Sequence, residues 1–284
     1  MSDPDTSLRA RCLAILASGE LDAKLAPLPA DLDDAQPGPA VDVDGPERAP
    51  AIAFAARAPR LPLPRELGRP EARIACLARF AHHELMAVEL FAWALLRFPD
   101  APAALRRGLA RVIGEEQLHC RLYLARLDAH GARLEGHAHV PYFWNQVPAL
   151  RASPHGIAAF LAGMGLTLEQ ANLDFTLLWR DAFRAAGDEP SARVCQRVHD
   201  DEVGHVRFAA EWLRRLAPGA DDAERYARCA PFPLGANRAK GRRFAVAPRE
   251  RAGLDRALIE HVRRARARPG ARRAPRADDG PTPA

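Results

Sequence analysis

The sequence reads EEQLHC at residues 115–120 and DDEVGH at residues 200–205, so the motif Glu-x-x-His occurs twice. Residues three apart on an α-helix lie on one face, so Glu116 with His119, and Glu202 with His205, can each present a carboxylate and an imidazole to one ion. One such motif arises readily by chance in a chain with 16 glutamates and 10 histidines. The spacing of the surrounding acids therefore decides whether the two motifs belong together.

Four long helices are predicted from apolar residues that recur at helical spacing, with proline or glycine near the helix ends. They span residues 70–98, 102–129, 153–186 and 191–216. Short turns join the first helix to the second and the third to the fourth, whereas one long connection separates the two pairs. No strand pattern emerges. The predicted fold is all-α, a four-helix bundle with one long crossover, which is the connectivity of ferritin-like proteins.

A further glutamate precedes each motif by nearly the same interval. The interval from Glu84 to Glu116 is only one position shorter than the interval from Glu169 to Glu202. On the predicted helices Glu84 and Glu116 are each about 14 residues, or about 21 Å, from the turn between their helices, so they share one level of the bundle. Glu169 and Glu202 match less well, with a difference of about 7 Å. The chain thus repeats one pattern: a glutamate, then Glu-x-x-His one helix later.

Four carboxylates and two imidazoles in a bundle core predict a site for two metal ions. Carboxylate and imidazole together suit iron or manganese, and the lack of thiolates in the set argues against structural zinc or iron–sulfur sites. Buried carboxylates without a counter-charge are costly, so a core that holds four of them requires a cation. The predicted ligands are Glu84, Glu116, His119, Glu169, Glu202 and His205.

An acid directly precedes the glutamate of each motif, Glu115 in the first and Asp201 in the second. Such a residue is turned about 100° from the ligand and faces a neighbouring helix. There it can accept a hydrogen bond from the outer nitrogen of a ligand histidine and so fix the ring. Both acids are predicted to support the ligands, the alternative being that they are solvated helix acids.

Two further residues compete for roles at the site. Glu89 is an alternative to Glu84 as the first-helix ligand, but it lies five residues later and about 140° round the helix, so Glu84 is favoured. Tyr123 lies one turn after His119 on the same face. It is either a core aromatic or a tyrosine that orients a ligand or is oxidised near the metals, and both interpretations stay open.

Two segments of different composition flank the bundle of residues 70–217. Residues 1–69 predict a short amphipathic helix followed by an extended linker rich in Pro and Asp. Residues 218–284 are rich in Pro and Arg, with one short helix predicted near residues 249–264 and disorder after about residue 265. The chain is therefore expected to have one folded unit with two extensions.

The formal charge of +5 combines two unlike parts. Residues 238–276 hold 14 basic and 3 acidic side chains, a net charge of +11, so the rest of the chain is acidic. This basic stretch has little aromatic content beyond Phe244 and no recognised nucleic-acid-binding module. An arginine-rich extension that wraps the bundle is therefore favoured over a nucleic-acid-binding tail.

Cysteine use and hydropathy indicate a cytoplasmic protein without a membrane partner. The five cysteines are far apart and form no CxxC pair, which favours reduced, buried thiols. The first residues lack the cationic start of a signal peptide. No apolar run reaches the length that a membrane span needs.

Several of these stretches resemble the ferritin-like superfamily and, within it, the DUF455 family, which is similar to the tRNA-hydroxylase (MiaE-like) branch. The resemblance is carried by AHHELMAVEL at 81–90, EEQLH at 115–119, LEQANLD at 168–174, DDEVGH at 200–205, PFPLGANRAKGRRF at 231–244 and RERAGLD at 249–255. It covers most of residues 70–260. It implies that Glu116 and Glu202, by analogy with the superfamily, bridge two metals. The residues matching the terminal ligands are Glu84 and Glu169.

These observations predict a non-haem oxidoreductase that activates O2 at two carboxylate-bridged iron or manganese ions. Its expected partners are O2, an unknown organic substrate and an electron donor, with tRNA as a weaker candidate. Two alternatives stay open: a ferroxidase or iron-handling protein, and a metal-stabilised scaffold without catalysis. A fold alone does not choose among them.

Overall fold

The computed structural model describes residues 7–29 and 32–266 of the chain. Within these ranges the protein is all-helical and contains no β-strand, so the predicted all-α fold is confirmed. The disorder predicted after about residue 265 falls almost wholly on residues 267–284, which lie outside the described part of the chain.

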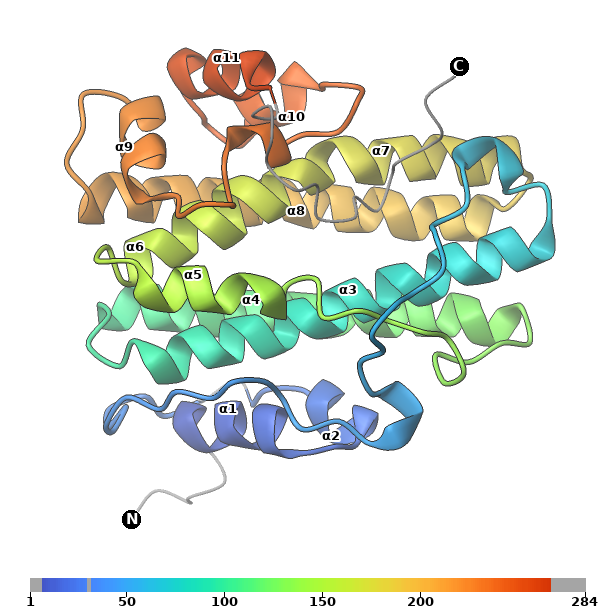
Figure 1. Cartoon of the computed structure of the whole chain (residues 1–284), viewed down its shortest axis with the longest axis horizontal. Helices are drawn as coiled ribbons and strands as arrows, with labels where there is room; N and C mark the ends of the chain where they lie inside the picture. The colour runs from blue at the N-terminus through green and yellow to red at the C-terminus, as the bar shows by residue number, and fades with distance from the viewer. Residues whose placement is uncertain (1–6, 30–31, 267–284) are drawn as a thin grey trace.

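Four long helical segments lie side by side and form the bundle (Figure 1). The main helices of these segments are α3 (Pro70–Arg97), α4 (Ala103–Ala129), α7 (Gln170–Ala185) and α8 (Glu189–Leu216). α3 and α4 form one hairpin and α7 and α8 the other, and contacts between α4 and α8 join the two hairpins. Proline in the first turn begins α3 and α8, where its missing N–H removes no helical hydrogen bond.

The third bundle helix is not regular along its length. It comprises α6 (Ile157–Phe160), a π-helical segment η5 (Leu161–Glu169) and α7 in unbroken succession. The sequence predicts one helix from residue 153 to residue 186, whereas the structure has a later start and a π segment. A Cβ on Gly165 would lie 2.4 Å from the Cβ of Ala209 on α8. The glycine therefore allows the wide π segment to approach α8 closely.

A long crossover, residues 130–156, connects the two hairpins and runs back along the bundle (Figure 1). It contains the short helices η4 (Trp144–Gln146) and α5 (Val147–Ala152). The backbone N–H of Ala55 donates to the carbonyl of His139 at 2.8 Å, which ties the crossover to the N-terminal part of the chain. The connectivity is therefore two hairpins separated by one long connection, as the sequence predicts.

The N-terminal residues 7–29 and 32–69 form a layer mainly against α3 and α4, and at residues 64–66 the chain reaches across to contact α7 (Figure 1). This N-terminal layer contains α1 (Leu8–Ala17), α2 (Leu21–Leu25), η2 (Pro50–Ile52) and η3 (Pro64–Glu66). Lys24 is completely buried, and its Nζ lies 3.0 Å from Glu89 of α3. The layer is therefore attached to the bundle by a buried charge pair.

The C-terminal part forms three short helices where the sequence predicts one. They are α9 (Asp222–Cys229), α10 (Val246–Arg251) and α11 (Arg256–Arg264), with a 3-10 turn, η6 (Ala236–Arg238), between the first two. Asp221 and Asp255 cap α9 and α11 by accepting backbone N–H groups at 2.8 Å. Caps of this kind satisfy N–H groups that the first turn leaves unpaired, so they stabilise even short helices.

Apolar side chains form two clusters, one toward each end of the bundle. On α4, Ile113 belongs to the first cluster and Cys120 to the second, while Glu116 and His119 lie between them. The same division falls within the other bundle helices. A polar layer therefore crosses the middle of the bundle, enclosed by apolar packing on both sides.

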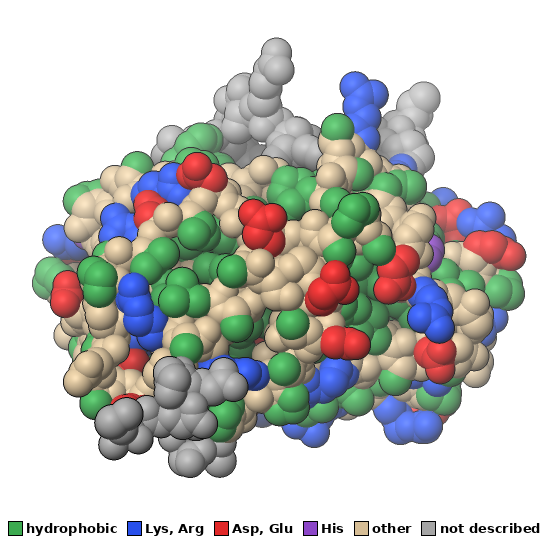
Figure 2. Space-filling model, turned by 90° about the horizontal axis from the view of Figure 1, so that it is seen from below, with side chains coloured by type: hydrophobic (Ala, Val, Ile, Leu, Met, Phe, Trp, Pro, Cys, Tyr) green, Lys and Arg blue, Asp and Glu red, His purple; other side chains and the backbone are tan. Residues whose placement is uncertain are grey.

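The surface on the side of the N-terminal layer carries mixed charges (Figure 2). Among the described residues on this face, basic and acidic side chains are interspersed with hydrophobic ones and form no large patch of one sign. This face therefore lacks the electrostatic footprint of a nucleic-acid-binding surface. No helix in the described part of the chain is both long and apolar enough to cross a bilayer.

Candidate metal centre

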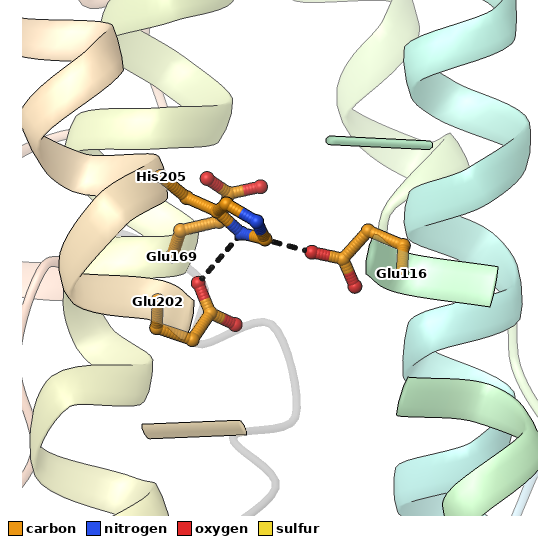
Figure 3. A group of neighbouring side chains, drawn as sticks. All are labelled: Glu116, Glu169, Glu202 and His205. Atoms are coloured by element: carbon orange, nitrogen blue, oxygen red, sulfur yellow. Dashed lines mark ion pairs between the residues drawn. The ribbon is translucent and has the colours of Figure 1, made fainter. Parts of the chain in front are cut away.

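The six predicted ligands converge in the polar layer between the two apolar clusters. They form two groups whose ligand atoms lie within 4.8 Å of one another: Glu116, Glu169, Glu202 and His205, and Glu84, Glu116 and His119. Figure 3 shows the first group, with Glu116 of α4 facing the side chains of the second hairpin. Glu116 belongs to both groups, so it occupies the position expected of a carboxylate that bridges two ions.

Each motif histidine is held from outside by the acid of the opposite motif. His119 Nε2 lies 2.9 Å from an oxygen of Asp201, and His205 Nε2 lies 2.7 Å from an oxygen of Glu115. The first bond runs from α4 to α8 and the second from α8 to α4. Such bonds orient a ligand imidazole, and here they leave both Nδ1 atoms facing the inner carboxylates.

The inward-facing atoms of the cluster are buried and have no hydrogen-bond partner among the described residues. They are both oxygens of Glu116, one oxygen each of Glu169 and Glu202, and the Nδ1 atoms of His119 and His205. His205 Nδ1 lies 3.1 Å from Glu116 and 3.4 Å from Glu202, without hydrogen-bond alignment. Buried carboxylates are costly without a counter-charge, so this arrangement fits divalent cations.

The pKa values of the carboxyl groups show that negative charge in the cluster is unfavourable unless positive charge lies close to it. Burial, together with the charges of neighbouring carboxylates, raises the pKa of Glu84 and of Glu169 well above the usual value. Burial also raises the pKa of Glu202. Burial opposes the charged form of Glu116 too, but interaction with the two histidines outweighs it and lowers its pKa. Only one of these four carboxyl groups is thus stabilised as an anion, and it is the one shared by both groups.

The histidines show the opposite response. Burial alone would lower the pKa of His119, but the hydrogen bond to Asp201 and the nearby Glu116 raise it to about 10. Burial is likewise outweighed at His205, where Glu115 and the inner carboxylates raise the pKa well above its usual value. Protons on the imidazoles therefore supply the charge that divalent cations would supply, and metal binding to such ligands releases protons.

The two candidates on α3 have different surroundings. Glu84 contributes to the group with Glu116, as described above, and is 6% exposed. Glu89 is paired instead with Lys24 at 3.0 Å and Arg48 at 2.7 Å, and it accepts a hydrogen bond from Trp144 Nε1 at 3.1 Å. Both oxygens of Glu89 are engaged in the N-terminal layer and crossover, so Glu84 is the residue placed to bind a metal.

Tyr123 lies within the second apolar cluster. Its hydroxyl donates to Cys195 Sγ at 3.9 Å, and its ring packs edge-on against Phe80. In the described structure it makes no hydrogen bond to any of the six predicted ligands. Burial, and then the neighbouring Cys195, raise the pKa of its phenol well above the usual value. These surroundings fit the core-aromatic interpretation, and a redox role stays a prediction.

Asn172 is a site residue that the sequence reasoning missed. Its Nδ2 donates to one oxygen of Glu202 at 2.8 Å. Asn172 lies three residues after Glu169, so it shares a helix face with a predicted ligand, and that spacing is the signal that identifies it. The other oxygen of Glu202 faces His205, which leaves that oxygen for a metal.

A second missed feature is a stacked pair of histidines, His82 of α3 and His139 of the crossover. Their ring centroids are 4.1 Å apart with an interplanar angle of 8°, and Phe54 contacts His82 edge-on. Among the described residues none of the four ring nitrogens has a hydrogen-bond partner. Because the rings are parallel, their in-plane lone pairs do not converge on one point, so the pair is a structural junction rather than a metal site.

The fold and the cluster define a class of protein: an all-α helical bundle with carboxylate and histidine groups buried at its centre. The chain matches the model of a family described as protein of unknown function (DUF455) over residues 8–260. It therefore belongs to the DUF455 family. The match ends within α11, as the sequence motifs indicate, and it includes the N-terminal layer, which lies outside the range of residues 70–260 that those motifs cover. No curated protein and no solved structure matches the chain.

Proposed function

We propose that this chain is a ferritin-like, non-haem di-metal protein that holds two iron or manganese ions and acts as an O2-activating oxidoreductase. The observation that carries the proposal is the set of orphaned, inward-facing ligand atoms from four glutamates and two histidines. Four carboxylates and two Glu-x-x-His histidines on four bundle helices are the donor set of di-iron and di-manganese carboxylate proteins. The donor types present therefore fit the metals.

The residues would play three roles: one ligand common to both ions, ligands of a single ion, and residues that orient the ligands. Glu116 would contact both ions, because it belongs to both groups. Glu84 and His119 would bind one ion, and Glu169, Glu202 and His205 the other. The crossed bonds from Asp201 and Glu115 would hold the two imidazoles in place. This assignment makes Glu202 a ligand of one ion, because Asn172 already holds its other oxygen.

Bound iron supplies the redox chemistry by which O2 is reduced, and the protein contributes geometry and a dry environment. The two apolar clusters enclose the polar layer, and all six ligands are 6% exposed or less. Water is therefore excluded, which strengthens electrostatic interactions inside the site. A small molecule such as O2 can reach such a site through local fluctuations, whereas a larger substrate needs an opening between helices.

The organic substrate is to be sought in two chemical classes. They are small metabolites and tRNA, of which tRNA, suggested by the resemblance to the tRNA-hydroxylase branch, is the weaker candidate. The mixed charge of the face in Figure 2 gives no support for RNA binding there. We place the protein in the cytoplasm, in keeping with its five buried cysteines, none of which forms a disulfide.

The test is metal loading followed by exposure to O2. Full-length protein is incubated anaerobically with Fe(II), desalted, and analysed for bound metal, and O2 consumption is then followed with tRNA or metabolite mixtures examined by mass spectrometry. We expect about two ions per chain and O2 uptake coupled to an organic product. The variants Glu116→Ala and Glu202→Ala should lose the metal, while Glu71→Ala, at an exposed acid of α3, should retain it.

The outcomes separate the three functional classes. Many irons turned over per chain without an organic product would indicate a ferroxidase. Two bound ions without O2 reactivity would indicate a metal-stabilised scaffold. Zero metal, or zinc alone, in the folded wild-type protein would contradict the di-metal proposal.

A further inference from the structure

Arg249 of α10 is completely buried against α7, where it pairs with Asp174. Two guanidinium nitrogens lie 2.7 and 3.0 Å from the two carboxylate oxygens, in a bidentate arrangement. Arg249 also donates to the carbonyls of Ala245 and Ala239, and the Phe244 ring centroid is 3.9 Å from its guanidinium carbon. Such a fork of charge-assisted bonds is strong and geometrically specific.

Asp174 also accepts hydrogen bonds from the backbone of the C-terminal segment. Its two oxygens accept the backbone N–H groups of Gly241 and Ala245 at 2.9 and 2.8 Å. The side chains of both members of the pair are 1% exposed or less. A buried pair is favourable only when its remaining hydrogen-bonding positions are filled, as they are here. The C-terminal segment is therefore fastened to α7 at one defined point.

That point lies about one helical turn beyond the junction at which the π segment η5 ends and α7 begins, because Asp174 is four residues after Gln170. A change from i→i+5 to i→i+4 hydrogen bonding disturbs the backbone ladder there, so carbonyls at the junction need other donors. Arg249 donates to the carbonyl of Gln170 at 3.3 Å. In the amide orientation that pairs both ends of Gln170, its Nε2 donates to the carbonyl of Leu166 at 2.7 Å and its oxygen accepts from Arg249 Nε at 3.2 Å.

The residue directly before Gln170 is Glu169, a predicted ligand. We propose that Arg249 is a positioning residue: the clamp formed by Arg249, Asp174 and Gln170 fixes the π-to-α junction and thereby holds the Glu169 carboxylate in its metal group. A slip of one residue at the junction would turn Glu169 about 100° away from the cluster. The inference rests on the proposed di-metal function, but its effect on the helix junction is measurable without metal.

A second ion pair provides a matched control. Arg214 of α8 bonds to Asp222 through Nε at 2.8 Å, and it donates to the carbonyl of Gly253 at 2.6 Å. It therefore also fastens the C-terminal segment to the bundle. None of these bonds reaches the junction of η5 with α7, although Tyr226 of α9 bonds to Thr167 of η5 at 2.6 Å. Loss of the Arg214 pair therefore tests attachment of the C-terminal segment while the clamp at the junction stays intact.

The experiment compares full-length wild type with Arg249→Met, Arg249→Lys and Arg214→Met. Circular dichroism checks folding, amide hydrogen exchange without metal follows residues 161–172, and anaerobic Fe(II) titration gives the affinity of each ion. We expect Arg249→Met to exchange faster in that segment. Its second ion should bind about 10- to 100-fold more weakly, as is usual when support for a ligand is removed. The occupancy after desalting should then fall from about two ions to about one, while Arg214→Met keeps both ions.

The results distinguish the clamp from the di-metal function. A folded Arg249→Met protein with wild-type exchange at residues 161–172 and two tightly bound ions would overturn the inference. If Arg249→Met does not fold, Arg249→Lys decides, because lysine keeps the charge beside Asp174 but lacks the fork that reaches Gln170. Faster exchange in that variant supports the clamp, and wild-type exchange overturns it. Failure of wild type to bind metal contradicts the proposed function, and the exchange data still decide whether the clamp exists.

Discussion

The two hairpins of the bundle supply equivalent ligands in different ways. In the first, Glu84 and Glu116 lie on regular helices, equally far in sequence from the last residue of α3 and the first residue of α4, respectively. In the second, Glu202 lies at that same interval from the start of α8, but Glu169 is further from the end of α7 and terminates a π segment. A repeated ligand pattern in sequence therefore does not require repeated backbone geometry.

The hairpins also differ in what covers them. The first is covered by the N-terminal layer through the buried charges of Lys24, Arg48 and Glu89. The second is covered by the C-terminal segment, whose clamp engages the junction beside a ligand. We infer that the N-terminal contacts mainly stabilise the fold, whereas the C-terminal contacts act on the site. This contrast leads to three predictions.

The largest effect is expected where the first hairpin meets the N-terminal layer. Glu89→Gln leaves two buried cations without their carboxylate, and removal of one partner of a buried ion pair costs about 3–5 kcal/mol. The free energy of unfolding, measured with urea, should fall by that amount. Glu71→Gln on the exposed start of α3 should change it by less than about 0.5 kcal/mol. Equal stability of the two variants would contradict a structural role for the Glu89 cluster.

A smaller effect should distinguish the π segment from a regular helix. Gly165→Ala places a Cβ 2.4 Å from the Cβ of Ala209, so it should destabilise the protein by about 1–3 kcal/mol through overpacking. Gly114→Ala, two residues before Glu116 on α4, has no neighbouring atom within 4 Å of its new Cβ. It should stabilise the protein by up to about 1 kcal/mol, because alanine favours helix over glycine. If urea unfolding shows that both substitutions change the free energy of unfolding in the same direction, the two hairpins are packed alike at these glycines.

The sequence predicts the regular part of this architecture well, because hydrophobic periodicity and proline positions define long helices. It also predicts that Glu115 and Asp201 contact the outer nitrogens of the histidines, because residue spacing determines which face of its helix each acid lies on. It does not predict the π segment, which depends on the close approach of Gly165 to α8. It also misses the Arg249 pair, because 75 residues separate its partners and no local pattern links them.

The smallest effect concerns the pH dependence of stability at the stacked pair of His82 and His139, where the first hairpin meets the crossover. Burial, aided by Arg79 and other nearby cations, lowers the pKa of His139 to about 4, below its ordinary value of 6.5. The unfolded chain therefore binds more protons than the folded protein between these values, and stability falls as pH drops below about 6.5. At pH 5 this group costs up to about 2 kcal/mol relative to pH 7.5.

His139→Leu should remove that part of the pH dependence, because leucine does not titrate in either state. Urea unfolding of both proteins at pH 7.5 and pH 5 isolates the effect, since any change in packing against His82 is present at both pH values and cancels in the difference. His155→Leu, at an exposed histidine of the same crossover, is the control and should leave the pH dependence unchanged. If His139→Leu loses as much stability on acidification as wild type, the acid sensitivity comes from groups other than His139, of which His82 is the nearest with a pKa lowered by burial. The difference between the hairpins would then rest on the buried charges of the N-terminal layer and on the π segment.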